Sequence, residues 1–215
     1  MPKPRKAHTQ KPLKTLRIFC EGEKTEPNYL NGYIKTLNDS ARKSVVAVED
    51  TRKNTAVQLV DEAIKFKESP VSLSEDEFWV VYDRESTAKY PDALHAEARQ
   101  KAARAGIKIA ICNVCFEYWL LLHFVETDAP YSCFDELIQK STLRAAFRQA
   151  YGSDYGKSVR SLFDKLKDRL PSARQRAHRL NDSGKATADP ARCEPHHINP
   201  YVGIVELLDA IDEFT

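Results

Sequence analysis

The stretch RIFCEGEKTEPNYL, residues 17–30, passes from an apolar strand pattern directly into a turn crowded with acids. The run Thr15–Cys20 is short and contains β-branched and aromatic residues, which predicts a buried strand. Glu21, Glu23 and Glu26 follow it closely. Acids gathered at the carboxyl end of a predicted core strand are either an ordinary solvated turn or the ligands of a bound group.

The first 112 residues alternate between strand-like and helix-like runs. Asn54 is the expected N-cap of the second helix, and Gly106 is expected to end the third. This order predicts an α/β fold with a mostly parallel four-stranded sheet flanked by helices. The predicted strands are Thr15–Cys20, Ser44–Glu49, Glu77–Tyr82 and Ile107–Cys112. The predicted helices between them are Glu26–Asn38, Asn54–Glu68 and Pro91–Ala105.

Beyond Cys112 the pattern becomes helical, and no further strand is predicted. The apolar run FEYWLLLHF, residues 116–124, predicts a buried helix, and residues 181–200 predict a long loop rich in turn residues. Further helices are predicted at Leu143–Ala150, Ser158–Asp168, Pro171–Asn181 and Val202–Phe214. The predicted organisation is a basic disordered tail (1–14), an α/β core (15–125) and a helical extension packed on the core (126–215).

The net charge of +2 conceals an uneven distribution. Residues 1–14 carry five Lys and Arg and no acid, and residues 140–180 carry eleven Lys and Arg against three Asp. Such basic segments predict either a polyanionic partner or an ordinary solvated helix surface. The five scattered cysteines, and the lack of an apolar run of membrane-spanning length, predict a cytoplasmic protein without a membrane segment.

A second acidic cluster follows the third predicted strand, in WVVYDRES, residues 79–86. Alternate residues of an extended segment point the same way, so Asp83 and Glu85 are expected to face one site while Arg84 faces away. Ligands of open parallel sheets bind beyond the carboxyl ends of the strands, where the strand order reverses. If the first and third strands are neighbours, these acids meet Glu21, and their mutual repulsion predicts a hard cation such as Mg²⁺ between them.

Glu117 lies inside the apolar run at 116–124, just beyond the fourth predicted strand. A carboxylate there either has its head in water, favoured by the helix dipole, or points at the same metal site, which is the interpretation we favour. His123 lies about 120° round the helix from Glu117 and is expected to be a packed residue. The residue types that bind zinc are present at Cys112, Cys115, Cys193, His196 and His197. Their wide separation along the chain favours instead a structural role for the cysteines, which we expect to be buried.

The motifs CEGEKTEPNYL, VYDRES and CNVCFEYWLLLHF, in this order, resemble those of the RloB family, a branch of the Toprim-like fold. The later YGKS at 155–158 and NPYVGIVELL near the C-terminus also fit, so the resemblance covers nearly the whole chain from Leu16. It implies a Toprim-like sheet that binds one or two Mg²⁺ or Mn²⁺ ions for phosphodiester chemistry. It also implies a role in bacterial anti-phage defence, beside an ABC-type ATPase partner.

By this resemblance, the glutamate after the first strand is Glu21 and the Asp-x-Asp pair after the third is Asp83 with Glu85. This chain departs from the pattern in two places, since Glu85 replaces an Asp and Glu26 lies one residue beyond the usual position of a further acid, here Thr25. The predicted catalytic residues are Glu21, Asp83 and Glu85. The predicted metal ligands are Glu21, Glu26, Asp83, Glu85 and Glu117. The predicted nucleic-acid contacts are Lys24, Arg144, Arg148, Lys157, Arg160, Lys165, Arg174 and Arg176.

Two functions of different classes follow from these residues. The first is a metal-dependent nuclease that hydrolyses DNA or RNA, with the basic residues binding phosphates and no base readout. The second is a non-catalytic regulatory subunit that binds metal or nucleotide and docks on an ABC-type ATPase. A haloacid-dehalogenase-type phosphatase needs its Asp-x-Asp after the first strand, where this chain has Glu21-Gly22. An oligomer is compatible with either function.

Overall fold

The computed structural model describes residues 12–37, 44–53, 55–157 and 159–214, and its centre is a five-stranded sheet of order β2-β1-β3-β4-β5. The mostly parallel α/β sheet and the pairing of the first and third strands are confirmed. The strands are β1 (Lys14–Cys20), β2 (Ser44–Glu49), β3 (Glu77–Asp83) and β4 (Lys108–Asn113), which run parallel, and β5 (Tyr201–Val202), which pairs antiparallel with β4.

The prediction of four strands is wrong because β5 was not recognised. Its two residues are too few to show the alternation by which a strand is read from sequence. The following Gly203 lets the chain approach β4, since a Cβ there would lie 2.7 Å from the backbone N and O of Ile111. The Gly203 N–H donates instead to the Ile111 carbonyl at 2.8 Å. Val202 therefore belongs to this edge strand and not to the last helix.

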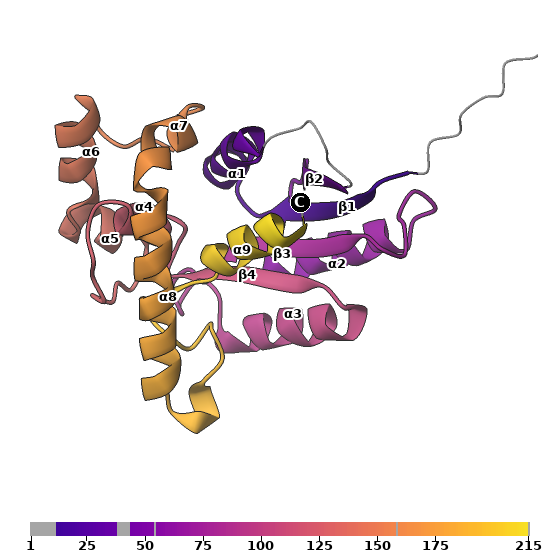
Figure 1. The fold of residues 1–215 in the computed structure, drawn as a ribbon. Coiled ribbons are helices and arrows are strands. Elements are labelled where there is room, and N and C mark those ends of the chain that lie inside the picture. Colours follow the sequence, from indigo (N-terminus) through magenta and orange to yellow (C-terminus); the bar gives the residue numbers. More distant parts are fainter. Residues whose placement is uncertain (1–11, 38–43, 54, 158, 215) are drawn as a thin grey trace, which may run out of the picture.

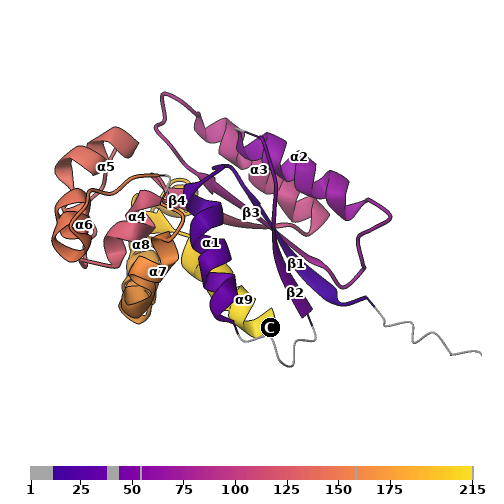
Figure 2. The ribbon, with the colours of Figure 1, turned by 90° about the horizontal axis from the view of Figure 1, so that it is seen from above.

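Helices cover both faces of the sheet, as Figure 2 shows from above. Helices α1 (Thr25–Thr36) and α9 (Ile204–Phe214) lie on one face, and α2 (Ala56–Lys67) and α3 (Asp92–Ala105) lie on the other. Neighbouring strand residues are divided between two apolar cores on these faces, Ile18 in one and Phe19 in the other. Burial on both faces explains why the parallel strands read as nearly continuous apolar runs.

The ends of α2 and α3 carry the predicted kinds of capping residue, but a different residue caps the start of α2. The α2 helix is capped by Thr55, whose Oγ1 accepts a hydrogen bond from the Gln58 N–H at 3.3 Å. The predicted cap, Asn54, lies outside the described residues. The α3 helix ends at Gly106 as predicted, with a left-handed φ of 63° that glycine adopts without strain.

Apart from α9, the helices of the second half of the chain lie beside one end of the sheet (Figure 1). Two features were not predicted, a helix between residues 133 and 141 and a short 3₁₀ turn after residue 189. The helices are α4 (Glu117–Leu122), α5 (Phe134–Lys140), α6 (Leu143–Tyr151), α7 (Leu162–Leu166) with its extension η1 (Lys167–Arg169), and α8 (Leu170–Thr187), followed by the 3₁₀ turn η2 (Pro190–Arg192).

The predicted loop at 181–200 is wrong in its first third, because α8 continues to Thr187. Tertiary contacts override the weak helix propensity of these residues. The Asn181 side chain donates to the Val202 carbonyl at 3.1 Å and accepts from the Val202 N–H at 2.9 Å, which fixes α8 on β5. Gly184 permits a close approach, since a Cβ there would lie 2.7 Å from Ile198.

The larger apolar core includes residues from both halves of the chain, among them Leu16, Trp119, Leu166 and Ile211. The helical second half therefore shares a core with the α/β first half. Lys14, placed in the predicted tail, is the first residue of β1, and residues 1–11 of that tail lie outside the described part. Within the described part, no helix combines the length and apolarity needed to cross a membrane.

Candidate functional site

A hollow of about 310 Å³ opens where β1 and β3 end and α4 begins. All five predicted metal ligands line it, although they come from three separate segments of the chain. The sheet order explains this, because β1 and β3 are adjacent and parallel and so end at the same edge. The lining residues are Glu21, Gly22, Glu23, Lys24, Thr25, Glu26, Asp83, Glu85, Glu117 and Lys157.

The turn after β1 brings two carboxylates to the hollow. Glu21 extends the strand pairing, since its N–H donates to the Val81 carbonyl at 2.9 Å, and its Oε2 accepts from the Asp83 N–H at 3.1 Å. Glu26, in the first turn of α1, folds back over Gly22. A Cβ at Gly22 would lie 2.0 Å from Glu26 Oε2, so the glycine leaves the space that this buried carboxylate occupies.

The end of β3 sends its side chains to opposite sides, as the alternation predicts. Asp83 and Glu85 line the hollow, and Asp83 Oδ1 accepts from the Phe116 N–H at 2.8 Å. Glu85 has a φ of 57°, a left-handed conformation that is strained for a residue other than glycine. Arg84 is 3% exposed and donates to Asp92 Oδ1 at 2.6 Å, away from the hollow.

Glu117 reaches the hollow from the start of α4. Its side chain is 2% exposed and has polar partners inside the protein. The Tyr155 hydroxyl donates to Glu117 Oε1 at 2.7 Å, and the Lys157 ammonium lies 3.8 Å from the same oxygen. The carboxylate therefore points into the site and not into water.

Burial and nearby carboxylates raise the pKa of three of the acids, Glu21, Glu26 and Asp83. Burial, reinforced by the Glu85 and Glu26 carboxylates, raises the pKa of Glu21 to about 7. Burial and the Glu117 carboxylate raise the pKa of Glu26 to about 7 as well. The pKa of Asp83 is raised well above its usual value, first by burial and then by the surrounding acids. A cation in the hollow would relieve this repulsion.

The carboxylates that line the hollow are the chemical type of ligand that a hard divalent ion binds. Their oxygens are not arranged as a coordination shell. Across the described ranges, no three His, Cys, Asp or Glu side chains stand ready to ligate one ion. The reason is visible for Glu85 and Glu117, which are held by Lys89 at 2.7 Å and by Tyr155. Carboxylate oxygens are the ligands that Mg²⁺ and Mn²⁺ prefer, so the five acids fit such an ion in their chemistry.

The zinc alternative has no support from the positions of its residues. Cys112 and Cys115 are buried, and burial raises the pKa of both thiols well above the usual value, which disfavours the thiolate that zinc requires. Cys193 is exposed. His123 is a packed residue, as predicted, with its ring nitrogens 3.0 Å from the Trp119 carbonyl and 3.1 Å from the Tyr29 hydroxyl.

Of the eight basic residues predicted to contact nucleic acid, Lys24 and Lys157 line the hollow. Two others hold α8 in place, since Arg174 donates to Asp212 at 2.6 Å and Arg176 to the Leu122 carbonyl at 2.7 Å. The remaining four lie on the helical half of the chain, away from the hollow's lining. Arg144 and Arg148 pair with Asp154, Lys165 lies over the Tyr151 ring, and Arg160 is exposed.

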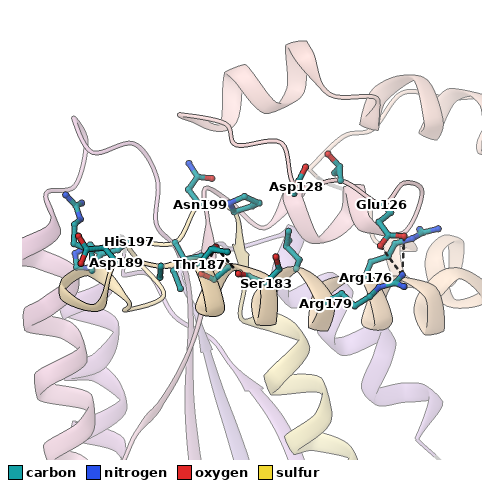
Figure 3. Close-up of a pocket in the computed structure, with 16 residues that line it drawn as sticks. Glu126, Asp128, Arg176, Arg179, Ser183, Thr187, Asp189, His197 and Asn199 are labelled. Carbon is teal, nitrogen blue, oxygen red and sulfur yellow. Dashed lines mark hydrogen bonds and ion pairs between the residues drawn. The ribbon is translucent and has the colours of Figure 1, made fainter.

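A larger groove of about 780 Å³ lies elsewhere, along α8. Figure 3 shows Arg176, Arg179 and Glu126 at one end, with His197 and Asp189 at the other. Its lining contains three arginines and three carboxylates, so its formal charge balances and gives no attraction for a polyanion. This groove lacks a carboxylate cluster, and sequence reasoning did not anticipate it.

Three residues that shape the hollow were not predicted from the sequence. Tyr155 was present in the quoted YGKS motif, but its bond to Glu117 joins residues 38 positions apart and could not be read from the sequence. Lys89 stands four residues after Glu85, a spacing that suggests pairing only in a helix, whereas this segment is a turn. Gly22 was quoted, but its role depends on where Glu26 folds.

The comparisons with known proteins give one match. The family model of the RloB-like protein matches residues 16–211, which is most of the chain and includes every carboxylate of the hollow. No curated protein and no solved structure matches. Because the match spans the sheet, the hollow and the helical second half together, the chain belongs to the family of RloB-like proteins.

Proposed function

We propose that this protein is a metal-dependent nuclease that hydrolyses phosphodiester bonds of DNA or RNA. One observation carries the proposal: five carboxylates from separate segments line a single hollow at the carboxyl edge of a parallel sheet. Isolated acids at the ends of strands are common in loops. Acids buried together, with the pKa of two of them raised to about 7, are an arrangement that a divalent ion stabilises.

In the proposed mechanism, Glu21, Asp83 and Glu85 would hold the ion, and Glu26 and Glu117 on the same lining would complete its set of carboxylate ligands. When bound, one or two Mg²⁺ or Mn²⁺ ions would supply Lewis-acid stabilisation of the charge that builds on a phosphodiester during in-line attack by water. The backbone bonds from Asp83 to Glu21 and from Phe116 to Asp83 keep the two carboxylates in place. Lys24 and Lys157, on the lining, are placed to contact phosphate oxygens.

The wider proposal draws on the family resemblance. The parallel strands and the acids after β1 and β3 support a Toprim-like arrangement of the site. A role in bacterial anti-phage defence beside an ABC-type ATPase is part of this proposal. Arg144, Arg148, Arg160 and Lys165 extend the proposed phosphate-binding surface, although the two α6 arginines also pair with the exposed Asp154. Arg174 and Arg176 are left out of this surface, because their bonds to Asp212 and to the Leu122 carbonyl hold α8 in place.

The proposal is tested by incubating purified protein with Mg²⁺ or Mn²⁺ and a panel of single- and double-stranded DNA and RNA. Asp83→Asn keeps the shape of the side chain and its acceptor for the Phe116 N–H, but removes the charge. We expect this variant to lose cleavage by at least about a hundredfold while retaining nucleic-acid binding. Glu23→Gln, an exposed acid on the same lining, is the matched control. Undiminished cleavage by Asp83→Asn would end the proposal.

A regulatory subunit remains the second candidate because of the groove along α8. Its balanced charge and volume of about 780 Å³ suit a polypeptide partner better than a nucleic acid. A metal-binding module without catalysis would show no cleavage with any substrate while Mn²⁺ still raised its melting temperature. That combination would favour docking on an ATPase over nuclease activity.

A further inference from the structure

Two lysine ammonium groups, from different segments of the chain, lie beside carboxylates of the hollow. Lys89, in the turn between β3 and α3, lies 2.7 Å from Glu85 Oε1. Lys157, in the segment between α6 and α7, lies 3.8 Å from Glu117 Oε1. Together the two ammonium groups carry the charge of one divalent ion. They neutralise two of the five acids that would otherwise face one another.

The position of Lys157 is built by contacts on three sides. The Thr25 hydroxyl, at the start of α1, donates to the Lys157 carbonyl at 3.2 Å and fixes the backbone beside the hollow. The ammonium lies 3.8 Å from the centroid of the Phe134 ring, within the range of a cation–π contact. The ammonium is therefore held between an aromatic face and the buried Glu117 carboxylate, whose other contact is the Tyr155 hydroxyl.

This pairing also explains why five carboxylates line one hollow without forming a coordination shell. Glu85 is paired with Lys89, while Glu117 accepts from the Tyr155 hydroxyl and has the Lys157 ammonium beside it, and across the described residues no three acids converge on a common point. A divalent ion brings two charges to one position, while the lysines divide the same charge between two places. Ion binding and the two lysine contacts therefore compete for the same carboxylates.

We propose that Lys89 and Lys157 are placeholder cations, which a divalent ion displaces from Glu85 and Glu117 and which are thereby released to bind the phosphates of the substrate. This inference rests on the proposed function and adds an order of events to it. In the ion-free site both ammonium groups lie beside carboxylates, although the Lys89 and Lys157 side chains are 53% and 56% exposed. The ion-loaded site presents two free cations beside the hollow. Ordinary surface ion pairs would instead leave ion affinity unchanged when either lysine is removed.

The test measures Mn²⁺ affinity without nucleic acid, by the loss of the free-ion electron paramagnetic resonance signal. Lys157→Met and Lys89→Met each remove a competing charge, and we expect each to tighten the Mn²⁺ dissociation constant about three- to tenfold. Lys157→Arg retains the charge and is expected to restore wild-type affinity. Lys24→Met, an exposed lysine on the same lining, controls for loss of positive charge and is expected to change affinity less than about twofold.

A second measurement distinguishes competition between Lys157 and the ion for Glu117 from a general change in the electrostatic field of the hollow. In the Glu117→Gln background, Lys157→Met should no longer alter Mn²⁺ affinity, because the competing pair is already broken. In the presence of Mn²⁺, Lys157→Met should also bind a single-stranded oligonucleotide more weakly, with a reduced salt dependence. Unchanged or weaker Mn²⁺ affinity in both methionine variants would overturn the placeholder inference alone. Failure of the wild-type protein to bind Mn²⁺ would overturn the proposed function with it.

Discussion

Removing the charge of Glu21 should stabilise the ion-free protein, although this residue is proposed to be a metal ligand. The carboxylate is partly buried beside Glu26 and Glu85, and burial with these neighbours raises its pKa from 4.5 to about 7. The folded protein therefore binds the proton more tightly than the unfolded chain does. Between pH 4.5 and about pH 7 the free energy of unfolding falls as the pH rises, and this loss of stability is complete above pH 7.

The size of the effect follows from the shift in pKa. An increase from 4.5 to about 7 corresponds to about 3 kcal/mol of destabilisation once the group is ionised. Glu21→Gln removes this penalty and keeps the oxygen that accepts from the Asp83 N–H. The new amide N–H₂ needs partners of its own, which offsets about 1–2 kcal/mol. We expect a net gain of about 1–2 kcal/mol at pH 8, or a rise of about 3–6 °C in melting temperature.

The assay is thermal unfolding in EDTA at pH 5 and pH 8, repeated with Mn²⁺. At pH 5 the folded wild-type protein holds the Glu21 proton and has lost only about 1 kcal/mol of stability, so the amide cost of about 1–2 kcal/mol should leave the variant melting with the wild type or up to about 3 °C below it. At pH 8 the variant should melt higher in EDTA and gain less from Mn²⁺. Glu23→Gln, an exposed acid in the same turn, should change neither value. A Glu21→Gln variant that melts lower than wild type at pH 8 would refute the proposed repulsion.

Two further substitutions test parts of the structure around the hollow. Gly22→Ala places a Cβ where the Glu26 carboxylate now lies, so it should weaken Mn²⁺ binding about tenfold in a calorimetric titration, and unchanged affinity would exclude Glu26 from the site. Arg84→Met leaves the partners of a buried guanidinium without their donor, including the His196 carbonyl at 3.0 Å, and should lower the free energy of unfolding in urea by about 3 kcal/mol. A decrease of less than about 1 kcal/mol in the free energy of unfolding would show that the hydrogen bonds of Arg84 do not stabilise the fold.

The first half of the fold could be predicted because each element there has a complete local signal. The parallel strands are buried on both faces and read as apolar runs, and α3 is bracketed by Pro91 and Gly106. The second half depends on contacts between distant residues. The extension of α8 to Thr187 is stabilised by the hydrogen bonds between Asn181 and Val202. The strand β5 has only two residues, and no local sequence pattern predicts a strand of that length.

The candidate site was predictable where topology alone decides position. Acids after β1 and β3 must meet once those strands are neighbours, so Glu21, Asp83 and Glu85 follow from strand order. The lysines could not be assigned in the same way. Net charge and helix patterns indicated a basic surface, but the contact of Lys157 with Glu117 depends on how a connecting segment folds over α4.

In the turn Asp83-Arg84-Glu85, two proposed metal ligands flank a residue that stabilises the fold. The two acids face the hollow, where their repulsion opposes folding, while Arg84 between them points to the other side. There the Arg84 guanidinium donates to Asp92 and to carbonyl groups that include that of His196. A buried arginine with all these partners fixes the backbone that presents the acids, at the position where Glu85 adopts a strained φ. The bonds on one side thus offset the repulsion that the proposed metal site requires on the other.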